Sequence, residues 1–324
     1  MKRNLMLLLF AWVVLIPNTY SQDSFQPFIT LWEVNDSKQI RYELDSDFTY
    51  DYHFKWMDED GTTISEGNIN VNSGIIVTSF DDPGNYQLEI TGTFPRFFGY
   101  PKDQLLDVAQ WGNIPWKTME GSFENWPGES FSATDAPDLS SVTNLSRMFK
   151  NAINFDEDLN HWDVSNSTNM REMFAGASAF NGDVGGWDVS KVTQFQEMFR
   201  GATSFDQQIG NWDVSKGNQM RGMFQDAIAF NQDIGNWDVS SAINFRDMFR
   251  GATLFNQDIG DWQTQNVENT REMFLGARAF NQDIGDWEVQ KVFNMFLMFE
   301  NAISFDQDLG NWEVIKVNNM NNMF

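Results

Sequence analysis

Tryptophan recurs at a fixed interval of 25 residues from Trp162 to Trp312, and this period constrains the fold more than any other feature of the sequence. Phenylalanine keeps the same interval from Phe155 to Phe305, and Met-Phe pairs keep it from 148–149 to 323–324. Alanine does so from Ala152 to Ala302. A fixed period of this length is typical of a solenoid, in which each unit buries its apolar face only against its neighbours.

Within one unit, the apolar residues follow two different spacing patterns. Met220, Met223, Phe224 and Ala227 are spaced as on one face of a short helix. After the break at Gly235, residues 237–239 favour a short strand. The sequence from 137 to 324 therefore predicts a right-handed, leucine-rich-repeat-like α/β solenoid of 25-residue strand-plus-helix coils.

The preceding region shows the alternation of β-strands. Aromatic residues occupy every second position from Phe48 to Trp56, and further apolar runs lie at 28–34, 74–80 and 86–94. We expect a small all-β sandwich at 22–98 and an N-terminal cap of the solenoid at 99–136. The stretches WMDEDGT (56–62) and DDPG (81–84) resemble the PKD-type immunoglobulin-like domain, although Glu59 replaces a glycine of that family.

Residues 1–21 predict a secretory signal peptide. Lys2 and Arg3 precede an apolar run from Leu5 to Ile16, and small residues precede a cleavage site before Gln22. The run is shorter than the roughly 20 residues that span a bilayer. We therefore expect a secreted or cell-surface, extracytoplasmic protein without a transmembrane segment after signal removal. The chain stops inside a repeat unit at Phe324 without a polar cap, which favours a truncated solenoid over one whose end is covered by a partner.

Composition restricts the chemistry. The chain has 46 acidic and 21 basic residues and a formal net charge of −25, so nucleic acids and anionic membranes are not expected partners. It has no cysteine and only two histidines, His53 and His161. No Ser-His-Asp set, phosphate-binding loop or histidine metal motif occurs. We expect a non-catalytic protein without an organic cofactor.

The repeated acidic and amide residues allow two interpretations. Asp183, Asp233, Asp258 and Asp283 occupy one column of the repeat. Their carboxylates either accept hydrogen bonds from backbone N–H groups in the glycine-containing turn or hold Ca²⁺ between coils. An asparagine and glutamine column from Asn144 to Asn319 is expected to bond coil to coil or to cap the helix. Seven arginines from Arg147 to Arg271 are expected to pair with acids or to form part of a contact surface.

Outward positions that vary between units are the expected ligand-facing residues. One column includes Lys191, Lys216, Ser241 and Lys291, and the other includes Thr203, Ile228, Thr253 and Arg278.

The repeat pattern WDVSxxxNMxxMFxGAxxFNQDIGxW resembles that of the BspA-type leucine-rich-repeat surface proteins of bacteria, whose 25- or 26-residue repeats were first grouped as a domain of unknown function in Mycoplasma. Residues 105–123 and 133–149 resemble the segment that precedes those repeats. The resemblance implies an exported surface protein that mediates adhesion or protein–protein contacts. Its partners would be host, neighbouring-cell or matrix proteins. The alternatives are a glycan-binding or glycan-active module and a calcium-stabilised matrix protein.

Overall fold

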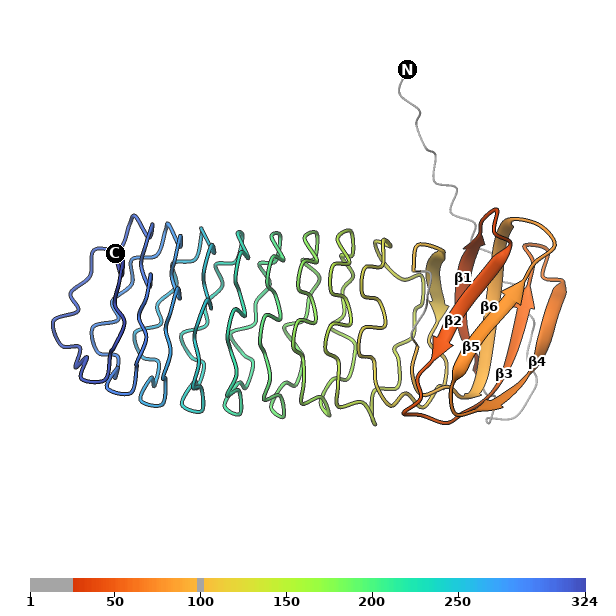
Figure 1. Cartoon of the computed structure of the whole chain (residues 1–324), viewed down its shortest axis with the longest axis horizontal. Helices are drawn as coiled ribbons and strands as arrows, with labels where there is room; N and C mark the ends of the chain where they lie inside the picture. Colours follow the sequence, from red (N-terminus) through yellow and green to blue (C-terminus); the bar gives the residue numbers. More distant parts are fainter. Residues whose placement is uncertain (1–25, 98–101) are drawn as a thin grey trace, which may run out of the picture.

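The protein consists of a β-sandwich followed by a long stack of coils (Figure 1). The computed structural model describes residues 26–97 and 102–324. The predicted signal peptide therefore lies outside the described residues. The strands are β1 (Phe28–Val34), β2 (Gln39–Leu44), β3 (Tyr50–Met57), β4 (Thr63–Val71), β5 (Gly74–Ser79), β6 (Gly84–Thr93) and β7 (Leu105–Gln110).

The sandwich has two antiparallel sheets. One has the strand order β4-β3-β6-β1-β7, and the other consists of β2 and β5. The alternation in β3 puts Tyr50, Tyr52 and Trp56 in the core. Across the two sheets the hydroxyl groups of Tyr42 and Tyr52 lie 2.9 Å apart. Burial of these large aromatic side chains stabilises the sandwich.

β7 connects the sandwich to the coils. It pairs with β1 in the sheet, and the carbonyl of Val108 accepts a hydrogen bond from Ala133 on the far side of the strand. The Trp111 ring lies 5.8 Å from Phe28 of β1 and 5.3 Å from Trp162 of the stack. One continuous hydrophobic core therefore runs through both parts of the molecule.

Each 25-residue unit, which we call a coil, lies over the preceding one. Parallel β-bridges connect the column Asn144, Asn169, Gln194, Gln219, Asn244, Asn269, Asn294 and Asn319. Beyond each bridge, alternate N–H groups donate to carbonyls of the next coil; those of Glu172 and Phe174 do so at 2.9 Å. The intervening N–H groups close turns within the coil, as from Met173 to the Met170 carbonyl.

The predicted strand-plus-helix α/β solenoid is wrong, because the described residues contain no helix and their regular secondary structure is entirely β. In the segment expected to be helical, Gly222 and Asp226 have φ angles of 60° and 57°. A right-handed helix needs φ near −63° at every residue and N–H groups that bond within the segment. Here half of these N–H groups bond the next coil. The strand expected at 237–239 is also absent.

The interior repeats as vertical stacks of rings. Phe174 and Phe199 are parallel within 2°, with centroids 5.6 Å apart, and Trp187 and Trp212 are parallel within 6° at 6.4 Å. Within a coil, the rings of Phe174 and Phe180 lie 3.9 Å apart. Tryptophans 25 residues apart in the sequence therefore face each other in successive coils.

Candidate contact surfaces

The phrase FNQDIG, which recurs in successive coils, contains an amide ladder that joins them. The side-chain oxygen of Asn231 accepts a hydrogen bond from the N–H of Asn256 at 2.9 Å, and Asn256 accepts one from Asn281 at 2.8 Å. Asp206 serves as the acceptor in the same way at 2.9 Å. The neighbouring glutamine adds a rung, because Gln282 donates to the side-chain oxygen of Asn256 at 2.9 Å. These side chains are therefore used by the stack itself.

The predicted calcium ligands also take part in backbone turns. Asp183, Asp233, Asp258 and Asp283 each accept a hydrogen bond from the glycine two residues later, at 2.8–3.0 Å. Such an Asx turn reverses the chain without help from an ion. No group of three or more His, Cys, Asp or Glu residues in the described ranges is arranged to hold a metal ion. The backbone hydrogen bonds of the first interpretation of this column are therefore present in the structure.

A second aspartate column has the same role. Asp163, Asp188 and Asp213 accept hydrogen bonds from the serine N–H groups two residues later, at 3.0 Å each. Hydrogen bonds from these serines hold the pKa of all three carboxyl groups below the usual value. The asparagine column repeats the pattern, since Asn169 and Asn244 accept from the arginines at positions 171 and 246 at 3.0 Å. Because no helix follows, these asparagines begin a series of turns.

The two columns of predicted ligand-facing residues lie at the surface. Lys191, Lys216, Ser241 and Lys291 are exposed, and within this column Lys191 donates to Asn166 of the preceding coil at 2.7 Å. In the other column Ile228 and Arg278 are exposed, whereas Thr203 and Thr253 are half-buried. The Thr203 hydroxyl donates to the Ser178 carbonyl at 3.1 Å. Each column brings its members together in successive coils, and within residues 102–324 no hydrogen bond or ion pair joins the side chains of the two columns.

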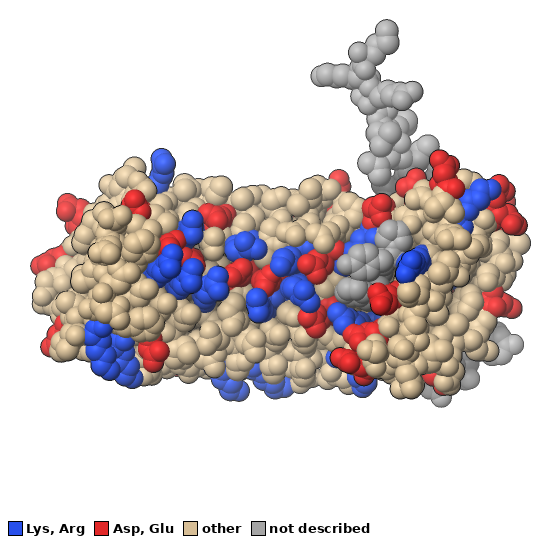
Figure 2. All heavy atoms as spheres, in the orientation of Figure 1, with Lys and Arg blue, Asp and Glu red and all other residues tan. Residues whose placement is uncertain are grey.

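A third surface follows the turns that replace the predicted helix. We call it the arginine stripe. It comprises Arg147, Lys150, Arg171, Arg200, Arg221, Arg246, Arg250 and Arg271, with the acidic partners Glu120, Glu172, Glu197, Asp247 and Glu272. Figure 2 shows basic and acidic side chains in a band along the coil stack. The sequence contained the arginines but did not show that turns align them on one face.

The acids of the stripe lie beneath its arginines. Only 8% of the Glu172 side chain and 5% of that of Asp247 is exposed, compared with 57% of Arg171 and 43% of Arg221. Burial raises the pKa of Glu172, but the charges and hydrogen bonds of Lys150 and Arg171 together outweigh this effect and keep its pKa below the usual value. Burial dominates at Asp247 and raises its pKa despite Arg246. The outermost charges of the stripe are thus positive.

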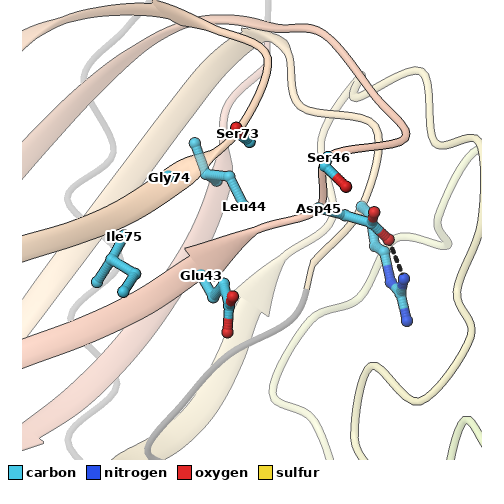
Figure 3. Close-up of a pocket in the computed structure, with 8 residues that line it drawn as sticks. Glu43, Leu44, Asp45, Ser46, Ser73, Gly74 and Ile75 are labelled. Atoms are coloured by element: carbon cyan, nitrogen blue, oxygen red, sulfur yellow. Dashed lines mark hydrogen bonds and ion pairs between the residues drawn. The ribbon is translucent and has the colours of Figure 1, made fainter.

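A pocket in the sandwich was not predicted from the sequence. Its volume is about 500 Å³, and it lies where β2 ends and β5 begins, between Glu43, Ser46, Ser73 and Ile75 (Figure 3). Arg96 forms an ion pair with Asp45 at its margin and donates to the Glu120 carbonyl at 3.0 Å. These groups therefore connect the sandwich to the first coil.

The fold defines a repeat protein in which stacked coils continue the core of a β-sandwich. The family model described as "Mycoplasma protein of unknown function, DUF285" matches residues 117–235, 185–278 and 218–324, and the chain belongs to this family. No curated protein and no solved structure matches the chain. None of the described residues forms a helix long and apolar enough to cross a membrane.

Proposed function

We propose that the protein is a non-catalytic, exported surface protein that mediates adhesion or protein–protein contacts through the side of its coil stack. The family match is compatible with the BspA-type repeat proteins suggested by the sequence, and membership of that group is part of the proposal. So are the signal peptide, the PKD-like character of the sandwich, and the host, neighbouring-cell or matrix proteins as partners.

The observation that carries the proposal is a set of exposed apolar side chains in and beside the variable column that contains Ile228, where Ile228 and Leu254 lie in adjacent coils. Ile153 is 55% exposed and Ile228 is 46% exposed in this column, and Leu254, which follows Thr253, is 55% exposed. Single exposed apolar residues are common on soluble proteins, whereas neighbouring ones on a varied surface, such as Ile228 and Leu254 of adjacent coils, are a feature of interaction sites. The coil interiors stay constant while these positions change, so the stack can alter its contacts without altering its core.

Binding assays with the full chain after signal removal test the proposal. The protein would be incubated with immobilised matrix proteins and with whole bacterial cells, and retention measured for the natural sequence, for a triple variant Ile153→Asp/Ile228→Asp/Leu254→Asp, and for a control. The control, Lys191→Asp/Ser241→Asp/Lys291→Asp, places three aspartates in the other variable column.

We expect the natural protein to be retained and the first variant to lose about tenfold or more in affinity, because charged groups resist burial in an interface. Unchanged melting temperatures would show that the coils stay intact. Equal losses of affinity in both variants would show that the column containing Ile228 is not the binding surface. Absence of retention on every surface would refute the contact function.

The alternative that the protein acts on glycans is tested by an activity assay. Hydrolysis of a polysaccharide that disappears on mutation of a single aspartate would replace the contact function with catalysis. Candidate positions are the coil aspartates, whose carboxylates the structure places in Asx turns.

A further inference from the structure

The arginine stripe is not required to build the coils. Coil positions equivalent to Glu172 and Asp247 are occupied by Gly222 and Leu297, and all four residues have φ between 55° and 60°. Leu297 still donates to the next coil at 3.1 Å, as Asp247 does at 2.9 Å. The turn therefore keeps its geometry at positions that have no acid and no ion pair.

The stripe is cationic on a strongly acidic protein. Its eight basic residues exceed its five acidic residues by three, whereas the whole chain has a formal net charge of −25. The buried acids also fix the arginines in place. Arg221 contacts Glu197 of the preceding coil at 3.2 Å and Asp247 of the following coil at 3.9 Å. A guanidinium carries five N–H donors, so an arginine held by one acid keeps donors for an external anion.

The shape of the stripe restricts the partner. It follows six consecutive coils, from Arg147 to Arg271, in which Phe174 and Phe199 of neighbouring coils lie 5.6 Å apart. A ligand that contacts its whole length must be an extended chain with repeated negative charges. Every Phe and Trp from residue 120 to residue 272 is buried. At the end of the stripe the half-buried Phe296 ring lies under Arg271 at 5.1 Å. One ring at one end does not supply the series of aromatic anchors or stacking platforms along the stripe that protein interfaces and single-stranded nucleic acids use.

We propose that the arginine stripe binds an extended anionic polysaccharide, with its arginines donating charge-assisted hydrogen bonds to carboxylate or sulfate groups. Guanidinium groups pair with such groups in a bidentate manner. The inference rests on the proposed contact function, but it concerns residues other than those of the variable columns and names the chemistry of one partner.

The test measures affinity for four soluble probes: polygalacturonate, dextran sulfate, neutral dextran and poly-L-glutamate. Three versions of the full chain without the signal peptide would be compared. The stripe variant is Arg171→Gln/Arg221→Gln/Arg250→Gln. The matched control, Lys191→Gln/Lys216→Gln/Lys291→Gln, removes the same charge from an exposed column outside the stripe.

We expect the natural protein to bind one or both anionic polysaccharides, not neutral dextran, with an affinity that falls as salt rises. The stripe variant should lose about tenfold or more in affinity, and the control less than about twofold. A second variant, Gln225→Arg, adds a cation beside the stripe and should strengthen binding, which keeps the test decisive if the triple variant unfolds.

Three outcomes overturn the proposal: no binding to either anionic polysaccharide, equal losses in the stripe and control variants, or tighter binding to poly-L-glutamate than to both polysaccharides. Retention on cells or matrix proteins without polysaccharide binding would refute the proposed role of the arginine stripe but not the contact function. Polysaccharide binding without such retention would refute the protein-contact function.

Discussion

At the scale of single residues, the repeated motif FNQDIG is explained by the contact that each of its recurring positions makes. In residues 230–237, Phe230 stacks on Phe205, Asn231 joins the amide ladder, and Asp233 makes a turn. The Trp237 indole donates to the Ile209 carbonyl of the preceding coil at 3.0 Å. The phrase recurs because each coil meets the same surface on its neighbour.

Gly235 is needed because the next coil comes too close for a side chain. A Cβ at this position would lie 2.6 Å from the Asp258 carbonyl oxygen. We expect Gly235→Ala to lower the free energy of unfolding by about 1–3 kcal/mol, because one of the two coils must move. Urea denaturation measures the change. The control Asn236→Ala alters the exposed neighbouring position and should change stability by less than about 0.5 kcal/mol; equal effects would argue against the clash.

Lys102 makes stability depend on pH. Its side chain is buried where the sandwich meets the first coil and donates to the Gly121 carbonyl at 2.5 Å. Burial lowers the pKa of Lys102 to about 7 from its usual value of 10.5. Between these values the unfolded chain holds a proton that the folded protein has lost, so stability should rise with pH by about 1 kcal/mol per unit.

Urea denaturation at pH 7.5 and 9 would measure this rise. Lys102→Met should flatten it, and an unchanged slope in that variant would assign the dependence to other groups. Above pH 10 the trend should reverse, because burial raises the pKa of Tyr52 to about 12 and the folded protein then retains a proton that the unfolded chain loses.

At the scale of the coil, hydrogen bonds between neighbours replace those of a helix or a continuous sheet strand. The amide ladder provides the sharpest test. In Asn256→Leu the N–H of Asn281 loses its acceptor at 2.8 Å, and Gln282 loses one at 2.9 Å. We expect a loss of about 1–3 kcal/mol in the free energy of unfolding, because half-buried polar groups are left without partners.

The control for this substitution comes from the sequence itself. Asp206 occupies the same column and accepts the Asn231 N–H at 2.9 Å. Asn256→Asp should therefore retain most of the stability in thermal melts. If the aspartate variant were as unstable as the leucine variant, the ladder would not be the cause.

At the scale of the whole molecule, the sandwich covers the first end of the coil stack. Repeat proteins need a terminal unit that shields their exposed end, and Trp111 lies at the centre of this junction with 1% of its surface exposed. We expect Trp111→Ala to cost about 3–5 kcal/mol and to separate the unfolding of the two parts.

Hydrogen exchange would measure the coupling by comparing amides of β6 with amides in coils near Phe174. In the natural protein both regions should open with similar free energies, and in the variant the values should diverge. Parallel changes in both regions would mean that the junction does not depend on this side chain.

The sequence predicted the period, the apolar interior of each unit and strands β1, β3, β5 and β6, because regular apolar spacing determines which side chains are buried. It did not predict the coil backbone, since Met220, Met223, Phe224 and Ala227 fit one helix face and also a series of turns. A signal for positive φ was nevertheless available in the sequence. Gly251 and Asn301, which have positive φ, occupy equivalent positions in two coils, and glycine and asparagine adopt this conformation more readily than most residues.

The sequence by itself determined that each unit buries the same residues, because side-chain hydrophobicity and a fixed interval suffice to specify a repeated interior. Only the tertiary structure decided where the backbone hydrogen bonds go. Each N–H can bond within its own segment or across to a neighbouring coil, and this choice depends on contacts between residues 24 or 25 positions apart. The same contacts align the charged side chains of separate units into one cationic line.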